Sequence, residues 1–202
     1  MMRRGVAGKG QGGKAGRVLI VTDEMIPAWV EGRLTPVEKL AVHRQGLRHK
    51  AVSVFVLSDR GILIQRRALG KYHTPGLWAN SCCTHPLWGE ADAVCAERRL
   101  AEELGISGLD LQAAGCVEYR AEVGGGMVEH EVVALFRAHA PADLAMALNP
   151  DEAMDARWIS LADLSAEIAA KPESFTPWLR IYLAEHADQI LGAGPAEPVQ
   201  NS

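Results

Sequence analysis

A short segment of the chain combines side-chain types that bind metal ions and transfer protons. It reads NSCCTHP, over residues 80–86, and places two adjacent cysteines just before His85. Thiols and imidazoles both ligate divalent ions, and both exchange protons when their surroundings tune the pKa. A structural zinc site is the weaker interpretation, because it requires a second pair of Cys or His ligands, and neither Cys95 nor Cys116 supplies one.

A second segment, VEHEV over residues 128–132, sets Glu129 and Glu131 two positions apart in an apolar stretch. Because alternate residues of a strand point to the same face, both carboxylates can reach one ion, while His130 points to the other side. The pattern therefore indicates a strand with two carboxylates on one face.

Residues 90–105 have the pattern of an amphipathic helix, with apolar residues at helical spacing and Gly105 as a natural C-terminal stop. Arg99 and Glu103 lie one turn apart on this helix and share a face. From spacing alone, these charges indicate a solvated helix face.

The same segment, continued to Ile106, also resembles the Nudix box, G-x5-E-x7-R-E-U-x-E-E-x-G-U with U apolar. The matching residues are Glu90, Arg98, Leu100, Glu102, Glu103, Gly105 and Ile106. Thr84 stands in place of the leading Gly, and Arg99 in place of the Glu of the R-E pair. In Nudix hydrolases these carboxylates hold Mg²⁺ against a diphosphate. The resemblance thus implies diphosphate binding, while the two departures disfavour pyrophosphate hydrolysis.

Three separated segments extend the resemblance over residues 17–190, namely RRALGKYHTPGLWANSCCTHP, VEYRAEVGGGMVEHEV and FTPWL. Together they resemble the type I isopentenyl-diphosphate isomerases, a divergent Nudix-fold family. This implies an α+β fold, a Nudix-fold sandwich of mixed β-sheets and helices with the active site in a deep cleft. It also implies conversion of isopentenyl diphosphate to dimethylallyl diphosphate through a tertiary carbocation, a step of isoprenoid biosynthesis. No flavin is expected, since no dinucleotide-binding glycine motif is present.

The resemblance assigns proton handling to Cys83 and Glu131, with Tyr119 hydrogen-bonded beside the carboxylate. Which of the two is the acid and which the base stays open. Trp178 is implied as an aromatic shield for the carbocation, and Trp78 is a candidate second wall of the cleft.

Two metal sites are implied as well. Mixed nitrogen and oxygen ligands suit Mn²⁺ or Zn²⁺, with Mg²⁺ as an alternative; the ligands are His43, His49, His85, Glu129 and Glu131. A separate Mg²⁺ is held with the substrate diphosphate by Glu103 and the backbone carbonyl of Cys83. The implied diphosphate-binding cations are Lys39, Arg67, Lys71 and Arg99.

The elements that must position these residues follow from periodicity and turn signals. We expect strands at 17–24, 111–123, 127–140 and 155–160, a hairpin over 50–67, and helices at 90–105, 161–172 and 176–191. Residues 36–49 are expected as a loop or short helix, and residues 70–90 mostly as loop.

Composition sets wider limits. The chain has 202 residues, 48% of them hydrophobic, which suits one domain. Its formal net charge of −4 indicates no basic surface for nucleic acid or membrane. The first seventeen residues are an exception, with five Lys and Arg residues among glycines, and favour a disordered tail over a nucleic-acid-binding arm. We expect that domain over residues 17–191, with disordered tails at 1–16 and 192–202. With no export signal, we expect a cytoplasmic monomer or weak homodimer with free thiols, whose partner is its small-molecule substrate.

Two other functions are compatible with parts of the sequence. A Nudix hydrolase of a nucleoside diphosphate derivative would need the missing Glu at position 99 and would have no use for Cys83. A non-catalytic metal-binding module would tolerate loss of Trp178 and Tyr119.

Overall fold

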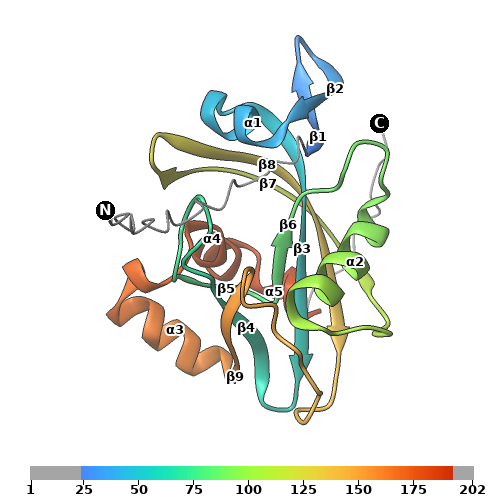
Figure 1. The fold of residues 1–202 in the computed structure, drawn as a ribbon. Coiled ribbons are helices and arrows are strands. Elements are labelled where there is room, and N and C mark those ends of the chain that lie inside the picture. The colour runs from blue at the N-terminus through green and yellow to red at the C-terminus, as the bar shows by residue number, and fades with distance from the viewer. Residues whose placement is uncertain (1–23, 193–202) are drawn as a thin grey trace, which may run out of the picture.

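The computed structural model describes residues 24–192 (Figure 1). Its strands are β1 (Met25–Val30), β2 (Arg33–Glu38), β3 (Arg48–Ser58), β4 (Gly61–Arg67), β5 (Trp78–Asn80), β6 (Cys82–Thr84), β7 (Gln112–Gly124), β8 (Met127–His139) and β9 (Ala153–Ile159). Its helices are α1 (Lys39–Gln45), α2 (Asp92–Leu104), α3 (Leu161–Ala170), α4 (Pro177–Glu185) and α5 (Ala187–Leu191), with a 3₁₀ turn, η1, at Pro172–Ser174. The strand expected at 17–24 and both expected tails lie outside the described residues, apart from Glu24 and Gly192.

Strand β3 lies at the centre of a mixed sheet. It pairs in parallel with β8, from Arg48 beside His130 to Leu57 beside His139, and antiparallel with β6. β7 pairs antiparallel with β8, and β4 joins β3 to β5 and β9. This arrangement places the two segments NSCCTHP and VEHEV on either side of β3.

Helices cover both faces of this sheet, and each face has its own apolar core. Val52, Val54 and Val56 of β3 pack with α2 on one face. Phe55 and Leu57 of the same strand pack with α3, α4 and α5 on the other. Figure 1 shows α2 and α4 on opposite sides of β3. The predicted α+β sandwich is confirmed, and the strand period of two explains how one strand serves two cores.

Several local expectations need correction. Residues 25–38, which the sequence analysis left largely unassigned, form the β1–β2 hairpin; its turn puts Glu31 at φ 51° and Gly32 at φ 77°. Two-residue hairpin turns require such positive φ angles because their twist matches that of the strands. The segment expected as mostly loop contains the short strands β5 and β6, since their backbones pair with β4 and β3.

The helix expected over 176–191 is divided in two. His186 leaves the helical conformation at φ −132° and ψ 15°, between α4 and α5. The break allows Ile190 of α5 to join the core beneath α4. The alternative of a short helix within 36–49 is confirmed by α1, which ends at Gly46 in the left-handed region. Within residues 24–192, no helix has the length and apolar character needed to span a membrane.

Candidate active site and metal centre

A small buried pocket on the α4 side of the sheet brings together many of the predicted site residues. Its volume is about 30 Å³. The predicted residues that line it are Lys39, Arg67, Lys71, Cys83, His85, Arg99, Glu129, Glu131 and Trp178. They come from segments far apart in the sequence, which converge because β6 and β8 flank β3.

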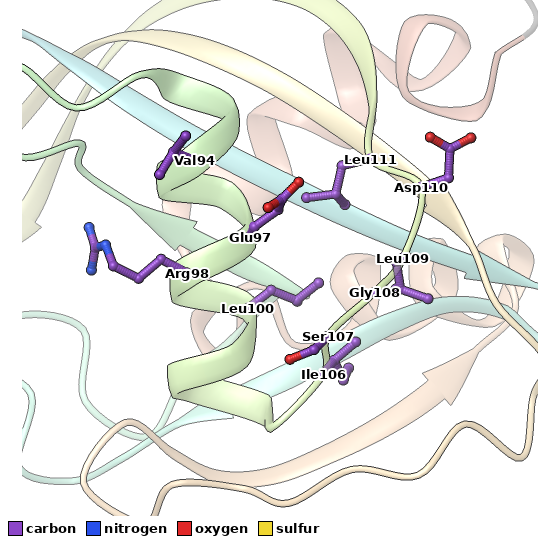
Figure 2. A pocket seen from close by; sticks show the side chains of 10 residues that line it. All are labelled: Val94, Glu97, Arg98, Leu100, Ile106, Ser107, Gly108, Leu109, Asp110 and Leu111. Carbon is purple, nitrogen blue, oxygen red and sulfur yellow. The ribbon is translucent and has the colours of Figure 1, made fainter.

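A larger hollow of about 530 Å³ lies elsewhere, between α2 and the segment that follows it. Figure 2 shows its lining, which includes Val94, Leu109 and Leu111, with Glu97 and Arg98 among them. It contains none of the histidines or cysteines of the predicted site. The chemistry is therefore concentrated in the smaller pocket.

Four buried side chains converge beside that pocket. His43 lies on α1, His49 near the start of β3, His85 just after β6 and Glu129 on β8. One ligand atom from each lies within 4.8 Å of the others. Glu129 Oε2 is 3.0 Å from His43 Nε2 and 3.4 Å from His49 Nε2, and His49 Nε2 is 3.2 Å from His85 Nε2.

Backbone carbonyls fix two of these rings from behind. His43 Nδ1 donates to the Lys39 carbonyl at 2.5 Å, and His49 Nδ1 donates to the Leu47 carbonyl at 2.7 Å. Because a carbonyl only accepts, each Nδ1 carries a proton, and a neutral ring then presents an unprotonated Nε2 to the cluster. Metal-binding histidines are supported in this way.

The polar atoms at the centre of the cluster fit a divalent cation. Within residues 24–192, His43 Nε2 and Glu129 Oε2 make no hydrogen bond although both are buried. Burial raises the pKa of Glu129, but the surrounding imidazoles hold it well below its usual range. Burial lowers the pKa of His49, yet Glu129 and Glu131 outweigh it and raise the value to about 10. Buried charges of this kind are paired or coordinate metals, and imidazoles around a carboxylate suit a divalent ion.

Glu131 lies beside this cluster and is held at both oxygens. Its Oε2 accepts a hydrogen bond from the Tyr119 hydroxyl at 2.6 Å, and its Oε1 is 2.9 Å from His85 Nε2. Tyr119 stands opposite Glu131 in the β7–β8 register. Burial and the Glu131 carboxylate raise the pKa of Tyr119, so the hydroxyl keeps its proton and donates it.

Cys83 is half-buried and faces the same side of the sheet as Glu131. The Ser53 hydroxyl donates to Cys83 Sγ at 3.2 Å and also lies 3.0 Å from the Tyr182 hydroxyl on α4. Burial and the Glu131 charge raise the pKa of Cys83 well above its usual value, so it is a thiol at neutral pH. Cys82 faces the other way, into the core beneath α2.

Two of the predicted diphosphate-binding cations share one carboxylate. Lys71 Nζ and Arg99 Nη2 both pair with Glu152 Oε2, the second at 3.1 Å. Arg99 Nη2 also donates to Glu103 Oε1 at 2.8 Å, as their helical spacing predicts. Glu103 Oε2 accepts from Gln65 Nε2 at 2.7 Å. Glu103 is thus buried against Arg99 rather than solvated.

The other two predicted diphosphate-binding cations, Lys39 and Arg67, have different partners. Lys39 Nζ pairs with Glu24 at 2.9 Å. Arg67 donates from Nη2 to the His73 carbonyl at 3.3 Å, and its Cζ lies 5.3 Å from the centre of the Trp178 ring. Trp178 is 2% exposed. The predicted cation shield and one predicted diphosphate ligand are therefore neighbours.

Four residues of the site were missed by sequence reasoning: Ser53, Tyr72, Glu152 and Tyr182. Ser53 follows His49 by four residues on β3, so strand periodicity alone places both on one face. His73 lies two residues after Lys71 and is a sequence candidate for the mouth of the cleft only, whereas the structure places it in the lining of the pocket. Glu152 and Tyr182 had no such signal, because only the folded chain brings them to Lys71 and Ser53.

The expectation that Trp78 walls the cleft is wrong. Trp78 lines a separate hollow of about 250 Å³ together with Phe175. The guanidinium of Arg157 lies 4.6 Å from the centre of its ring. Trp78 is held there by the pairing of β5 with β4 and by a bridge between Trp78 and Phe175. His130 points away from the cluster, as predicted, and lies 3.3 Å from Glu118.

Comparisons with known proteins show what the chain is similar to. The model of the NUDIX domain matches residues 47–179. An "Isopentenyl-diphosphate Delta-isomerase" of Cereibacter sphaeroides is 64% identical over 169 residues, which cover 84% of this chain and 96% of that protein. Proteins of the same name from Dinoroseobacter shibae and Rhodobacter capsulatus are 60% and 58% identical, over 84% and 85% of this chain and 96% and 97% of theirs.

Solved structures share the fold at low sequence identity. A protein from Deinococcus radiodurans is 16% identical with a TM-score of 0.64, covering 79% of this chain and 96% of its own. A MutT NUDIX hydrolase from Burkholderia pseudomallei is 24% identical with a TM-score of 0.54, covering 69% and 98%. At this identity the likeness concerns the fold alone.

Proposed function

The chain belongs to the Nudix family and, within it, to the isopentenyl-diphosphate isomerases, and we propose that the small buried pocket performs the isomerisation with Cys83 and Glu131 as its proton-handling groups. The protein is an isomerase that converts isopentenyl diphosphate to dimethylallyl diphosphate in isoprenoid biosynthesis. The observation that carries the proposed mechanism is a thiol and a carboxylate in one pocket with four cations and an indole.

Together, Cys83 and Glu131 can supply the proton that the reaction adds and accept the proton that it removes. One proton adds to the end carbon of the double bond and leaves a tertiary carbocation; another leaves the neighbouring carbon, and its bonding electrons form the new double bond. A thiol and a carboxylate together carry one transferable proton, so the protonated group gives its proton to the substrate, the other group accepts a different proton from it, and the pair still carries one proton afterwards. General acid–base catalysis of this kind typically contributes about 10²–10⁴-fold.

Hydrogen bonds orient both groups. We propose that Ser53, held by Tyr182, directs the Cys83 sulfur toward the substrate, supported by the distances of 3.2 and 3.0 Å along this chain. Tyr119 does the same for Glu131 through its bond of 2.6 Å. Ser53, Tyr182 and Tyr119 are all buried, which limits the rotation of the hydrogen-bonded side chains away from these positions.

The pocket also protects the carbocation. Trp178 presents an indole, whose face attracts a cation by about 2 kcal/mol when water is excluded. The volume of about 30 Å³ leaves room for roughly one water molecule, and water would capture the cation as an alcohol. An isopentenyl group needs more room, so substrate entry requires side chains to move. Tyr72 lines the pocket and is 43% exposed, so we propose that movement of its side chain admits the substrate.

The proposed ligands of a divalent ion are His43, His49, His85, Glu129 and Glu131. Three nitrogen donors favour Mn²⁺ or Zn²⁺ over Mg²⁺. When bound, such an ion supplies positive charge beside Glu131 and changes the proton affinity of that carboxylate. The chain's own contribution is to hold the His43 and His49 rings with their Nε2 atoms inward, through the carbonyls of Lys39 and Leu47.

The diphosphate is proposed to bind at the cation-rich side of the pocket, with Mg²⁺ at Glu103 and the Cys83 carbonyl. Both Glu103 oxygens already accept hydrogen bonds, but each retains a second lone pair for a metal. Without substrate, Glu152 pairs with both Lys71 and Arg99 and offsets part of their positive charge. The diphosphate then competes with Glu152 for the same two cations.

We also propose a cytoplasmic location, because Cys82, Cys83, Cys95 and Cys116 are all free and cytosolic conditions keep thiols reduced. The acid–base chemistry proposed here transfers no electrons to a cofactor, so no flavin is required.

The test is an assay of the purified protein with isopentenyl diphosphate and Mg²⁺ in D₂O, without added flavin. We expect dimethylallyl diphosphate with deuterium in its newly formed methyl group, because the added proton comes from an exchangeable side chain. Glu131→Gln should abolish most of this incorporation, and Glu118→Gln, an exposed glutamate on the neighbouring strand, should retain it. Release of phosphate in place of the isomer would contradict the proposal.

A further inference from the structure

His73 lines the pocket, and its segment carries the family resemblance, but the resemblance assigned this residue no metal or catalytic role. It is 6% exposed and belongs to the loop between β4 and β5. Its Nε2 lies 3.0 Å from Glu129 Oε1, and its Nδ1 lies 3.1 Å from the Thr74 hydroxyl. Both ring nitrogens therefore have a polar neighbour, and one of these is a carboxylate of the metal cluster.

The two contacts fix which nitrogen carries the proton. A carboxylate oxygen accepts, so Nε2 is the protonated nitrogen and donates to Glu129 Oε1. In a neutral ring Nδ1 is then an acceptor, and the Thr74 hydroxyl is the group that donates to it.

His73 and the other histidines contact different oxygens of Glu129. His43 and His49 approach Oε2, at 3.0 and 3.4 Å, and His85 lies 3.9 Å from the same oxygen. The converging ligand atoms come from those three histidines and Glu129, without His73. The hydrogen bond from His73 to Oε1 thus leaves Oε2 directed at the other imidazoles.

The local backbone is shaped to hold this ring in place. Thr74 has φ 45°, a left-handed conformation that is unusual for a β-branched residue and is further disfavoured before Pro75. The loop is tied to β4 by hydrogen bonds from Arg67 to the His73 carbonyl and from Arg66 to the Gly76 carbonyl. Backbone strain of this kind persists only where the surroundings impose it, and it is common at functional sites.

The ring of His73 also contacts the aromatic wall. It stands edge-on to Trp178, with centroids 5.9 Å apart, and lies nearly parallel to His43 at 5.6 Å. Its position between these two rings restricts rotation, so the hydrogen bond to Glu129 has a fixed direction.

We propose that His73 is a positioning residue of the metal centre: its Nε2–H holds Glu129 Oε1 and so turns Oε2 toward His43, His49 and His85. His73 acts through Glu129 and does not ligate the ion. The inference rests on the metal site of the proposed function, and removing such a supporting partner typically weakens metal binding by about 10–100-fold.

The experiment measures binding of Co²⁺ alone, by competition with a chelator and by the visible absorption of the bound ion. His73→Leu should weaken Co²⁺ binding by about 10–100-fold, because Glu129 loses its donor. His73→Gln should bind nearly as tightly as wild type, because its amide nitrogen can donate to Oε1. The absorption spectrum of the His73→Gln protein should match that of wild type, since the ligands are unchanged.

Two further variants keep the test sharp. Thr74→Val preserves the β-branched shape and removes only the hydroxyl, so it should weaken Co²⁺ binding by a smaller factor than His73→Leu does. It replaces His73→Leu in the experiment if that variant does not fold. His130→Gln is the matched control, because His130 lies on β8 between Glu129 and Glu131 but points away from the cluster. It should bind Co²⁺ as wild type does.

The possible results separate the inference from the function on which it rests. A wild-type protein that takes up no Co²⁺ would overturn the metal site and the role of His73 together. Equal affinities of wild type, His73→Leu and Thr74→Val would overturn the role of His73 alone. A weak His73→Gln protein with an altered spectrum would show that the ring nitrogen is itself a ligand, which also contradicts a positioning role.

Discussion

The two faces of the central sheet are built from adjacent residues and have opposite chemistry. Beneath α2, Cys82 packs with Val52 and Val54 in an apolar core. Beneath α4, Cys83 meets Ser53, one position along β3 from each of those valines. A shift of one residue therefore separates a packing position from the proposed reactive one, because successive side chains of a strand point to opposite faces.

The hollows on the two sides of the sheet also differ in the chemistry of the residues that line them. The hollow beside α2 is much larger, about 530 Å³ against about 30 Å³. The smaller pocket nevertheless holds the buried carboxylates Glu129 and Glu131 together with the thiol of Cys83. Buried titratable groups in mutual contact, rather than empty volume, are the reason for placing the proposed active site on the α4 face.

The largest effect on kcat is expected at the two adjacent cysteines, one on each face of the sheet. Cys83→Ala should lower kcat by about 10²–10⁴-fold, because a proton-handling group is lost. Cys82→Ala should retain nearly full kcat and lower the free energy of unfolding by about 1 kcal/mol, because a buried sulfur no longer fills its space. Steady-state kinetics measure kcat of both variants, and denaturant titration measures their free energy of unfolding. An inactive Cys82→Ala beside an active Cys83→Ala would reverse the assignment of the two faces.

A smaller effect is expected at Trp178, where packing and charge stabilisation can be separated. If the indole stabilises a carbocation by about 2 kcal/mol, Trp178→Leu should lose roughly 30-fold in kcat. Trp178→Phe should fall between wild type and the leucine variant, because a phenyl face attracts cations less strongly. Because Arg67 lies 5.3 Å from the ring, KM should rise as well.

The measurement at Trp178 is kcat and KM for the three proteins, with circular dichroism to confirm folding. A residue that only fills space would rank leucine and phenylalanine together. Equal kcat values for the two variants would therefore assign Trp178 to the apolar core of the α4 face alone.

The smallest effect compares two adjacent glutamates of α2. Glu103→Gln should raise severalfold the Mg²⁺ concentration needed for half-maximal activity, because Glu103 is buried at 3% exposure next to Arg99 and Gln65. Glu102→Gln should leave that concentration unchanged, since the Glu102 side chain is 45% exposed and bonds to Arg98 and Arg99. Activity measured across a Mg²⁺ titration gives the comparison. A larger shift for Glu102→Gln would mean that the helix presents its other face to the diphosphate.

Local patterns predicted much of the fold. The strand period placed Glu129 and Glu131 together, and the helical period placed Arg99 with Glu103. The short strands β5 and β6, the β1–β2 hairpin and the break at His186 escaped prediction. Each depends on backbone partners that are distant in sequence or on a turn conformation that residue type alone does not reveal.

The sequence by itself determined which residue types were available and which faces they occupy, because side-chain direction follows from local periodicity. Its motifs also indicated the family, and 64% identity to an isomerase over 84% of the chain agrees with that indication. Only the tertiary structure decided that Glu152 joins Lys71 to Arg99, that Tyr182 reaches Ser53 and Ser53 reaches Cys83, and that His73 reaches Glu129. Such contacts link residues on separate elements, and whether they form depends on distances of a few ångströms that are set by how the whole chain packs.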